Sequence, residues 1–185
     1  MLIFLSGGAK NGKSMLAQQL CRQLSGGRPL YYLATMIPRD AEDEQRIARH
    51  VRERAGWGFQ TLEWGRTLET HLAELPAGAT VLLDSVTALL ANEMFPGPEP
   101  EMAAPEPEMA APERTWRGLA ALCGRAENAV LVSDFIYSDA GRYDPLTEAY
   151  RRGLAMLDRA LCVRCDAAAE LCGGNVTVHK GVLPE

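Results

Sequence analysis

The sequence has no excess of basic residues, and this absence limits the partners it can have. Its 185 residues include 19 Lys and Arg against 24 Asp and Glu, with a formal net charge of -5. A surface that neutralises a phosphate backbone needs the opposite balance of charge. We therefore expect no nucleic-acid partner.

Long hydrophobic runs and an even set of cysteines are also missing. The N-terminal segment has neither a basic region nor an apolar stretch long enough for export or membrane insertion. The five cysteines leave one over from any full pairing, so no disulfide framework is expected. These absences predict a cytoplasmic protein with no membrane span. The 47% hydrophobic content is sufficient for one domain, residues 1–185, with a sizeable core.

Short apolar runs predict strands, and most of them are separated by segments with helical spacing. The predicted strands are Leu2–Leu5, Leu30–Ala34, Thr80–Leu83, Ala129–Val132 and Val176–Val178. This alternation predicts an α/β fold, a mostly parallel sheet with helices on both faces. Ligands bind beyond the carboxyl ends of such strands. One rim of the sheet is therefore expected to carry Gly7, Thr35, Asp84 and Asp134.

A tandem repeat interrupts this alternation. The seven residues "PEPEMAA" occur at Pro98–Ala104 and again at Pro105–Ala111, inside a Pro/Glu-rich insertion at 96–112. Two prolines in each copy exclude a continuous helix. We predict a solvated connector rather than a recognition site. The insertion does not divide the chain into domains, because strands on both sides of it are needed for one sheet.

The stretch "LIFLSGGAKNGKSMLAQQL" contains the pattern G-x-x-x-x-G-K-S between a predicted strand and a predicted helix. Such a P-loop directs backbone N–H groups and a helix N-terminus toward phosphate oxygens. The lysine, Lys13, would act in catalysis at the outer phosphates, and the hydroxyl of Ser14 would bind Mg²⁺. A glycine turn with a solvated lysine is the weaker alternative. The predicted nucleotide-binding loop comprises Gly7, Gly8, Ala9, Lys10, Asn11, Gly12, Lys13 and Ser14.

Asp84 ends the buried strand pattern "TVLLD" and has two interpretations. A P-loop enzyme needs a second carboxylate to orient Mg²⁺, typically at the end of a buried strand. An aspartate after a strand can also cap the next helix. The P-loop favours the metal role.

Three residues spaced by four, Arg46, His50 and Arg54, form one stripe of a predicted helix. The arginines could bind phosphate, and the histidine between them could act as a nucleophile. From spacing alone, an exposed helix flank is the preferred interpretation. His71 and His179 have the pattern of surface residues.

Cys162, Cys165 and Cys172 resemble a metal-binding pattern, but a structural zinc site needs four ligands. We predict core thiols instead.

These motifs together resemble one known family. In chain order the relevant stretches are "GGAKNGKS", "YYLATM", "RIARH", "TLE" and "LLDSVTALLANEMF". They resemble the bifunctional adenosylcobinamide kinase/adenosylcobinamide-phosphate guanylyltransferase family of cobalamin biosynthesis. The resemblance is close from Leu2 to about Phe95 and weaker from Ala129 to Lys180. The P-loop alone occurs in many nucleotide-binding families. A P-loop followed along the chain by R-I-x-x-H and L-D-x-x-T is specific to this family.

The resemblance implies a RecA-like P-loop NTPase fold, usually assembled as a homotrimer. It also implies two reactions: a nucleoside triphosphate, ATP or GTP, phosphorylates adenosylcobinamide, and GTP then donates GMP to that product. In the family the GMP passes through a histidine, and the matching residue is His50, which becomes the first choice for catalysis. The guanosine contacts would fall on Ala34, Thr35, Met36, Val51, Arg52, Glu53, Arg54, Glu63 and Asp84.

The sequence departs from the family pattern in three places, and the shortest is Ala55, which stands where a proline is expected after Arg54. The stretch "SDFIYSDAGRYDP" replaces an Asn-Glu-Val-Gly run and leaves Asp134 as the carboxylate there. Asp158 and Arg159 replace an Asn-Gln pair on the last helix. Two alternatives therefore stay open, a P-loop small-molecule kinase without guanylyl transfer and a non-catalytic nucleotide-binding regulator.

Overall fold

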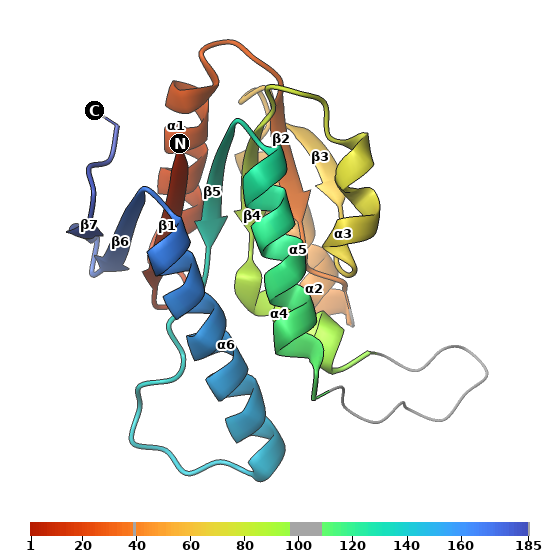
Figure 1. Ribbon diagram of the computed structural model, residues 1–185, viewed down its shortest axis with the longest axis vertical. Coiled ribbons are helices and arrows are strands. Elements are labelled where there is room, and N and C mark those ends of the chain that lie inside the picture. The colour runs from red at the N-terminus through yellow and green to blue at the C-terminus, as the bar shows by residue number, and fades with distance from the viewer. Residues whose placement is uncertain (39, 97–108, 185) are drawn as a thin grey trace.

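The structure is a computed structural model that describes residues 1–38, 40–96 and 109–184. Within these ranges one sheet has the strand order β3-β2-β4-β5-β1-β6-β7 (Figure 1). All neighbouring strands are parallel except β7, which runs antiparallel to β6 at one edge. The strands are β1 (Leu2–Gly7), β2 (Leu30–Ala34), β3 (Gln60–Glu63), β4 (Thr80–Asp84), β5 (Asn128–Val132), β6 (Ala167–Cys172) and β7 (Asn175–Lys180).

Helices cover both faces of this sheet, and each face has its own core. Successive residues of a strand point to opposite faces. Ile3 and Leu5 of β1 therefore join a core with Cys21 of α1, while Phe4 joins the second core with Leu119 of α5. In Figure 1, α4, α5 and α6 lie together on one face. The helices are α1 (Lys13–Ser25), α2 (Ala41–Glu53), α3 (Leu68–His71), α4 (Val86–Met94), α5 (Ala111–Arg125) and α6 (Pro145–Arg164).

The predicted α/β fold class is confirmed, and all five predicted strands are present, but two strands were not predicted. The missed strands are β3, "QTLE", and β6, "AAAELC". β3 is an edge strand with mostly exposed side chains, so it has no apolar run. β6 is buried but begins with three alanines, which have a low intrinsic preference for strands. Pairing with β1 determines its conformation.

The Pro/Glu-rich insertion lies mostly outside the described residues, so the predicted connector is not tested. Its last repeat residue, Ala111, is fully buried as the first residue of α5. That end of the repeat is therefore packed against the core. The helix can begin there because proline is tolerated in the first turn, which Pro112 occupies.

The cysteines are all free, as expected, but only part of the core prediction is right. Cys165 is buried and Cys162 is partly buried, whereas Cys172 at the end of β6 is exposed. Among the residues that the structure describes, no group of three His, Cys, Asp or Glu side chains could hold a metal ion.

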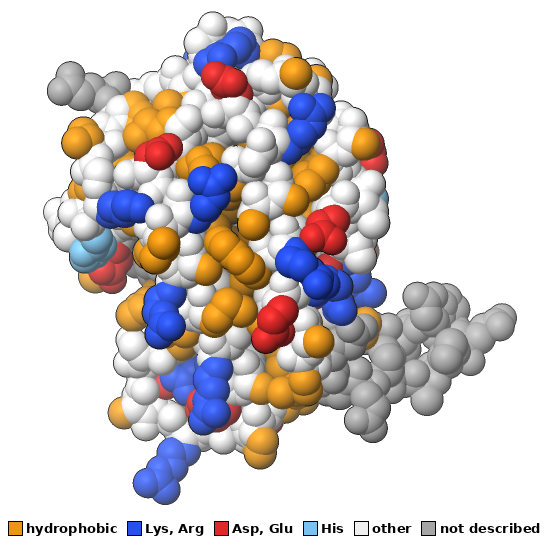
Figure 2. Space-filling view, viewed as in Figure 1, with side chains coloured by type: hydrophobic (Ala, Val, Ile, Leu, Met, Phe, Trp, Pro, Cys, Tyr) orange, Lys and Arg blue, Asp and Glu red, His pale blue; other side chains and the backbone are white. Residues whose placement is uncertain are grey.

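Two surface properties bear on the predicted partners. On the face seen in Figure 2, Lys and Arg side chains are scattered among hydrophobic and acidic ones rather than gathered in one patch. No helix in the described ranges is both long and apolar enough to cross a bilayer.

Candidate functional site

A cavity of about 770 Å³ lies at the carboxyl ends of the central strands. Its walls come from the loop after β1, the ends of β2, β4 and β5, and helix α2. The lining includes eleven of the predicted site residues, namely Lys10, Asn11, Gly12, Lys13, Ser14, Ala34, Met36, His50, Arg54, Glu63 and Asp84.

The P-loop begins where β1 ends and is fixed against β6. A Cβ atom on Gly7 would collide with the backbone carbonyl of Leu171, so only glycine fits there. The side chain of Asn11 donates a hydrogen bond to the same carbonyl at 3.1 Å. Gly12 has a φ of 87° and turns the chain into α1 at Lys13. The loop conformation predicted from the motif is thus enforced by a strand that the sequence did not reveal.

Lys13 is held by two partners at this loop. Its side chain is only 5% exposed, and Nζ donates a hydrogen bond to the carbonyl of Gly8 at 2.6 Å. The same Nζ forms an ion pair with Asp134 Oδ1 at 2.9 Å. Asp134 follows β5, as the predicted rim requires, and also lines the cavity. The ammonium group is therefore held between the P-loop and the residue that follows Ser133 after β5.

Asp84 is not the cap of the following helix. The side chain of Ser85 caps α4 by accepting a hydrogen bond from the N–H of Ala88. Asp84 Oδ2 instead accepts a hydrogen bond from the hydroxyl of Tyr32 at 2.7 Å. Because Asp84 and Ser14 line the same cavity, they fit Mg²⁺, which usually takes one or two carboxylates with hydroxyl, water and phosphate oxygens. The metal interpretation of Asp84 remains a proposal, and the cap alternative was wrong.

Arg54 connects helix α2 to Asp84 through Tyr32. Its guanidinium carbon lies 4.2 Å from the centre of the Tyr32 ring, and its side chain donates to Thr61 Oγ1. Arg54 is only 8% exposed and Tyr32 only 4%. This packing restrains the end of α2 beside the cavity. Sequence reasoning missed Tyr32, although a tyrosine in a buried strand needs a partner for its hydroxyl.

His50 lies on α2, is partly buried and lines the cavity together with Arg49. The side chain of Arg46 lies outside the described residues, so the predicted stripe is described only at His50 and Arg54. Gln18 of α1, a buried residue that the motif did not indicate, also contributes to the lining.

Seven predicted site residues are absent from the cavity lining or have no described side chain. Thr35 is fully buried, and its hydroxyl is hydrogen-bonded to the backbone of Ser85. Val51 and Arg52 are exposed on α2. The side chain of Glu53 is not described. The other three are Gly7, Gly8 and Ala9 of the P-loop. Of these, Gly8 accepts a hydrogen bond from Lys13 through its backbone carbonyl.

A buried carboxyl group supports the segment after β5. Asp158 of α6 is 2% exposed, and its Oδ2 accepts a hydrogen bond from the hydroxyl of Tyr137 at 3.0 Å. The pKa of Asp158 is raised to about 7, chiefly by burial and also by the nearby charge of Asp134, against hydrogen bonds from Ser133 and Tyr137 that lower it. Tyr137 and Asp158 belong to two of the stretches that depart from the expected family pattern, so these two departures contact one another.

Asp158→Asn is expected to stabilise the protein at alkaline pH. The folded state raises the pKa of Asp158 from 3.8 to about 7, so ionisation costs stability progressively between these values. The amide remains neutral and still accepts from Tyr137. The variant should unfold about 5 °C above the wild type at pH 8, with a smaller difference at pH 5. Thermal unfolding at both pH values measures this, and a difference independent of pH would contradict it.

Comparison with known proteins identifies the chain. A sequence model for the family described as cobinamide kinase / cobinamide phosphate guanyltransferase matches residues 3–178. The chain belongs to this family. The resemblance seen in the P-loop, R-I-x-x-H and L-D-x-x-T motifs is thereby confirmed.

Two relatives carry names that agree with the family. The chain is 40% identical over 88 residues to the bifunctional adenosylcobalamin biosynthesis protein CobP of Pseudomonas aeruginosa, covering 46% of this chain and 49% of the relative. It is 34% identical over 97 residues to the bifunctional adenosylcobalamin biosynthesis protein CobU of Salmonella typhimurium, covering 51% of each. The matched region thus spans about half the length of these relatives.

Solved structures confirm the P-loop NTPase fold. A KaiC-like protein from Pyrococcus horikoshii OT3 superposes with a TM-score of 0.53 at 14% identity, covering 97% of this chain and 78% of the other. An ATPase domain superposes with a TM-score of 0.55 at 9% identity, covering 99% of this chain and 78% of the other. At such low identity these similarities concern the fold alone.

Proposed function

We propose that this protein phosphorylates adenosylcobinamide and then transfers GMP from GTP to adenosylcobinamide phosphate through a guanylylated His50. The observation that carries the proposal is the shared cavity, which Lys13 and His50 both line. Its volume of about 770 Å³ falls within the range of small-molecule sites. Family membership and the names of the CobP and CobU relatives support the same assignment.

In the kinase step the phosphate loop holds the nucleoside triphosphate. The hydroxyl oxygen of adenosylcobinamide attacks the γ-phosphorus, and the bond from that phosphorus to the bridging oxygen breaks, releasing the nucleoside diphosphate. Lys13 balances charge on the outer phosphates. Asp134, 2.9 Å from Lys13 Nζ, is placed to accept the hydroxyl proton. Ser14 and Asp84 would hold Mg²⁺, which neutralises phosphate charge when bound.

In the guanylyl step a ring nitrogen of His50 attacks the α-phosphorus of GTP. A phosphorus–nitrogen bond forms, the bond to the bridging oxygen breaks, and pyrophosphate leaves. A phosphate oxygen of adenosylcobinamide phosphate then attacks the same phosphorus and releases His50. Covalent catalysis of this kind replaces one difficult displacement by two easier ones. Arg54, restrained by Tyr32 and Thr61, is positioned to balance charge on the α-phosphate.

We infer from the family resemblance that the protein assembles as a homotrimer. Sedimentation of the purified protein tests the assembly directly.

Labelling with GTP tests the proposal. Wild-type protein incubated with Mg²⁺ and α-labelled GTP is expected to acquire an acid-labile label, as a phosphorus–nitrogen bond requires, whereas γ-labelled GTP should leave none. Adding adenosylcobinamide phosphate should remove the label as adenosylcobinamide-GDP forms. If the protein phosphorylates adenosylcobinamide without ever becoming labelled, it is a kinase alone. Nucleotide binding without turnover of any corrinoid would indicate a regulator.

A further inference from the structure

The loop between β5 and α6, residues 133–144, borders the cavity next to Lys13. Its first residues are fixed to the site, because the N–H of Asp134 donates to Thr87 Oγ1 and the N–H of Phe135 donates to the carbonyl of Gly7. In Figure 1 this loop and the first turns of α6 extend beyond the carboxyl edge of the sheet. Since β2 and β5 flank β4, helix α2 and this loop approach Asp84 from two sides.

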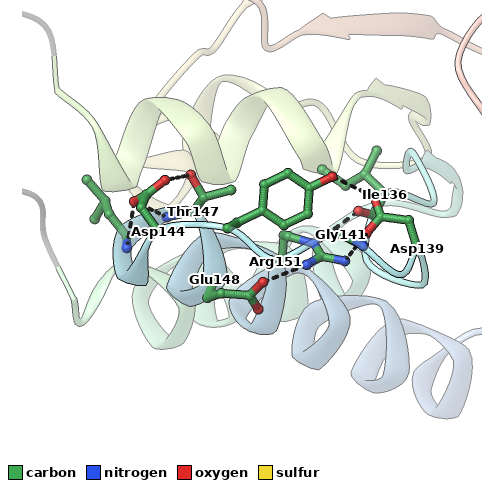
Figure 3. Close-up of polar contacts among 9 residues, drawn as sticks. Ile136, Asp139, Gly141, Asp144, Thr147, Glu148 and Arg151 are labelled. Carbon is green, nitrogen blue, oxygen red and sulfur yellow. Dashed lines mark hydrogen bonds and ion pairs between the residues drawn. The ribbon is translucent and has the colours of Figure 1, made fainter.

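Arg151 of α6 gives the loop its shape (Figure 3). The guanidinium pairs with Asp139 at 2.8 Å and with Glu148 at 2.7 Å, and Nε donates to the carbonyl of Ile136 at 3.3 Å. It also lies 4.5 Å from the centre of the Tyr143 ring. Arg151 is only 8% exposed, so its contacts with the loop are buried rather than on the surface. The planar guanidinium can donate to several acceptors of the loop at once in a fixed geometry, whereas the single ammonium group of a lysine could not.

The shaped loop presents apolar side chains to solvent beside the phosphate site. Phe135 is 41% exposed, Ile136 is 37% exposed and Tyr143 is 46% exposed. The rings of Phe135 and Tyr137 pack edge to face, with their centres 4.8 Å apart. Tyr137 is in turn held by Asp158. Two separate polar anchors thus maintain an exposed apolar surface directly after Asp134.

We propose that this surface, formed by Phe135 and Ile136, is the subsite for the corrinoid acceptor, and that Arg151 is a positioning residue for it. The inference rests on the proposed function. The acceptor must bring its hydroxyl to the outer phosphates at Lys13, so its body must cover a surface next to that residue. A corrin is a broad, flat and largely apolar macrocycle with amides at its rim. His50 of α2 and Arg54 at its end, which the proposed function assigns to the nucleotide, line the cavity on the other side, and this leaves the loop for the acceptor.

Phe135→Ala is the direct test, because the exposed ring can be removed with little risk to folding. The KM for adenosylcobinamide in the kinase reaction is expected to rise about tenfold, as loss of an apolar contact requires, while the KM for the nucleotide stays within about twofold. Arg151→Ala should show the same split, and Arg151→Lys should restore little of it. Arg152→Ala serves as the matched control, because Arg152 is the next residue of α6 and is exposed.

The outcomes separate this inference from the proposed function. If the wild type phosphorylates adenosylcobinamide but Phe135→Ala leaves both KM values unchanged, the loop is not the acceptor subsite. If Arg151→Ala raises the KM for the nucleotide and for the acceptor equally, Arg151 is a general structural residue. If the wild type fails to turn over adenosylcobinamide, the proposed function itself is wrong, and the subsite is rejected with it.

Discussion

Replacing His50 with alanine is expected to abolish the acid-labile label from α-labelled GTP and to reduce guanylyl transfer by at least about 10³-fold. The physical reason is that alanine offers no nucleophile for the α-phosphorus. Kinase turnover should persist at least in part, because phosphoryl transfer proceeds by direct in-line attack on the γ-phosphate and needs no protein nucleophile. The measurement is labelling together with separate kinase and guanylyl-transfer assays.

His71→Ala and His179→Ala are the matched controls for this experiment. His71 stacks on Trp64 and pairs with Glu74, and His179 of β7 pairs with Glu170 of β6. Neither histidine lines the cavity. If the His50→Ala protein still forms the adduct while one of these controls does not, the acceptor has been assigned to the wrong residue. Loss of both activities in His50→Ala would instead indicate that α2 needs His50 to keep its position.

The parts of the site that could be predicted are those whose chemistry is local in sequence. The P-loop needs a glycine turn, a lysine and a hydroxyl within eight positions, so Gly7 to Ser14 could be recognised directly. Asp84 was recognisable because it ends a continuous apolar run. His50 was preferred only through the family resemblance, since its spacing also fits an exposed helix flank.

The parts that could not be predicted depend on contacts between distant residues. The hydroxyl of Tyr32 reaches Asp84 across 52 positions, and Asn11 reaches the carbonyl of Leu171 across 160. No local pattern encodes such partners. The alanine-rich strand β6 was missed for the same reason, because its pairing with β1 rather than its side chains makes it a strand. The anchoring of the β5–α6 loop by Arg151 likewise appears only when both segments are folded.

Replacing Lys13 with alanine is expected to weaken nucleotide binding by about 100-fold and to remove phosphoryl transfer. Lys13 brings a positive charge to the outer phosphates and is held there by Gly8 and Asp134. The protein should still fold, because the loop remains fixed through Gly7 and Asn11 against β6. Circular dichroism checks folding, and equilibrium titration with a fluorescent GTP analogue measures affinity.

Lys13→Ala alone leaves Asp134 without its cationic partner beside the phosphates, and this unpaired carboxylate could itself repel the nucleotide. The double variant Lys13→Ala/Asp134→Asn removes both charges and separates the two effects. We expect the double variant to bind nucleotide almost as weakly as Lys13→Ala, because the missing attraction of the ammonium is the larger loss. Asp134→Asn alone should retain binding, since Lys13 keeps its charge and the carbonyl of Gly8 still restrains it. Recovery of wild-type affinity in the double variant would show that Lys13 serves only to neutralise Asp134, and the P-loop assignment of Lys13 would then be wrong.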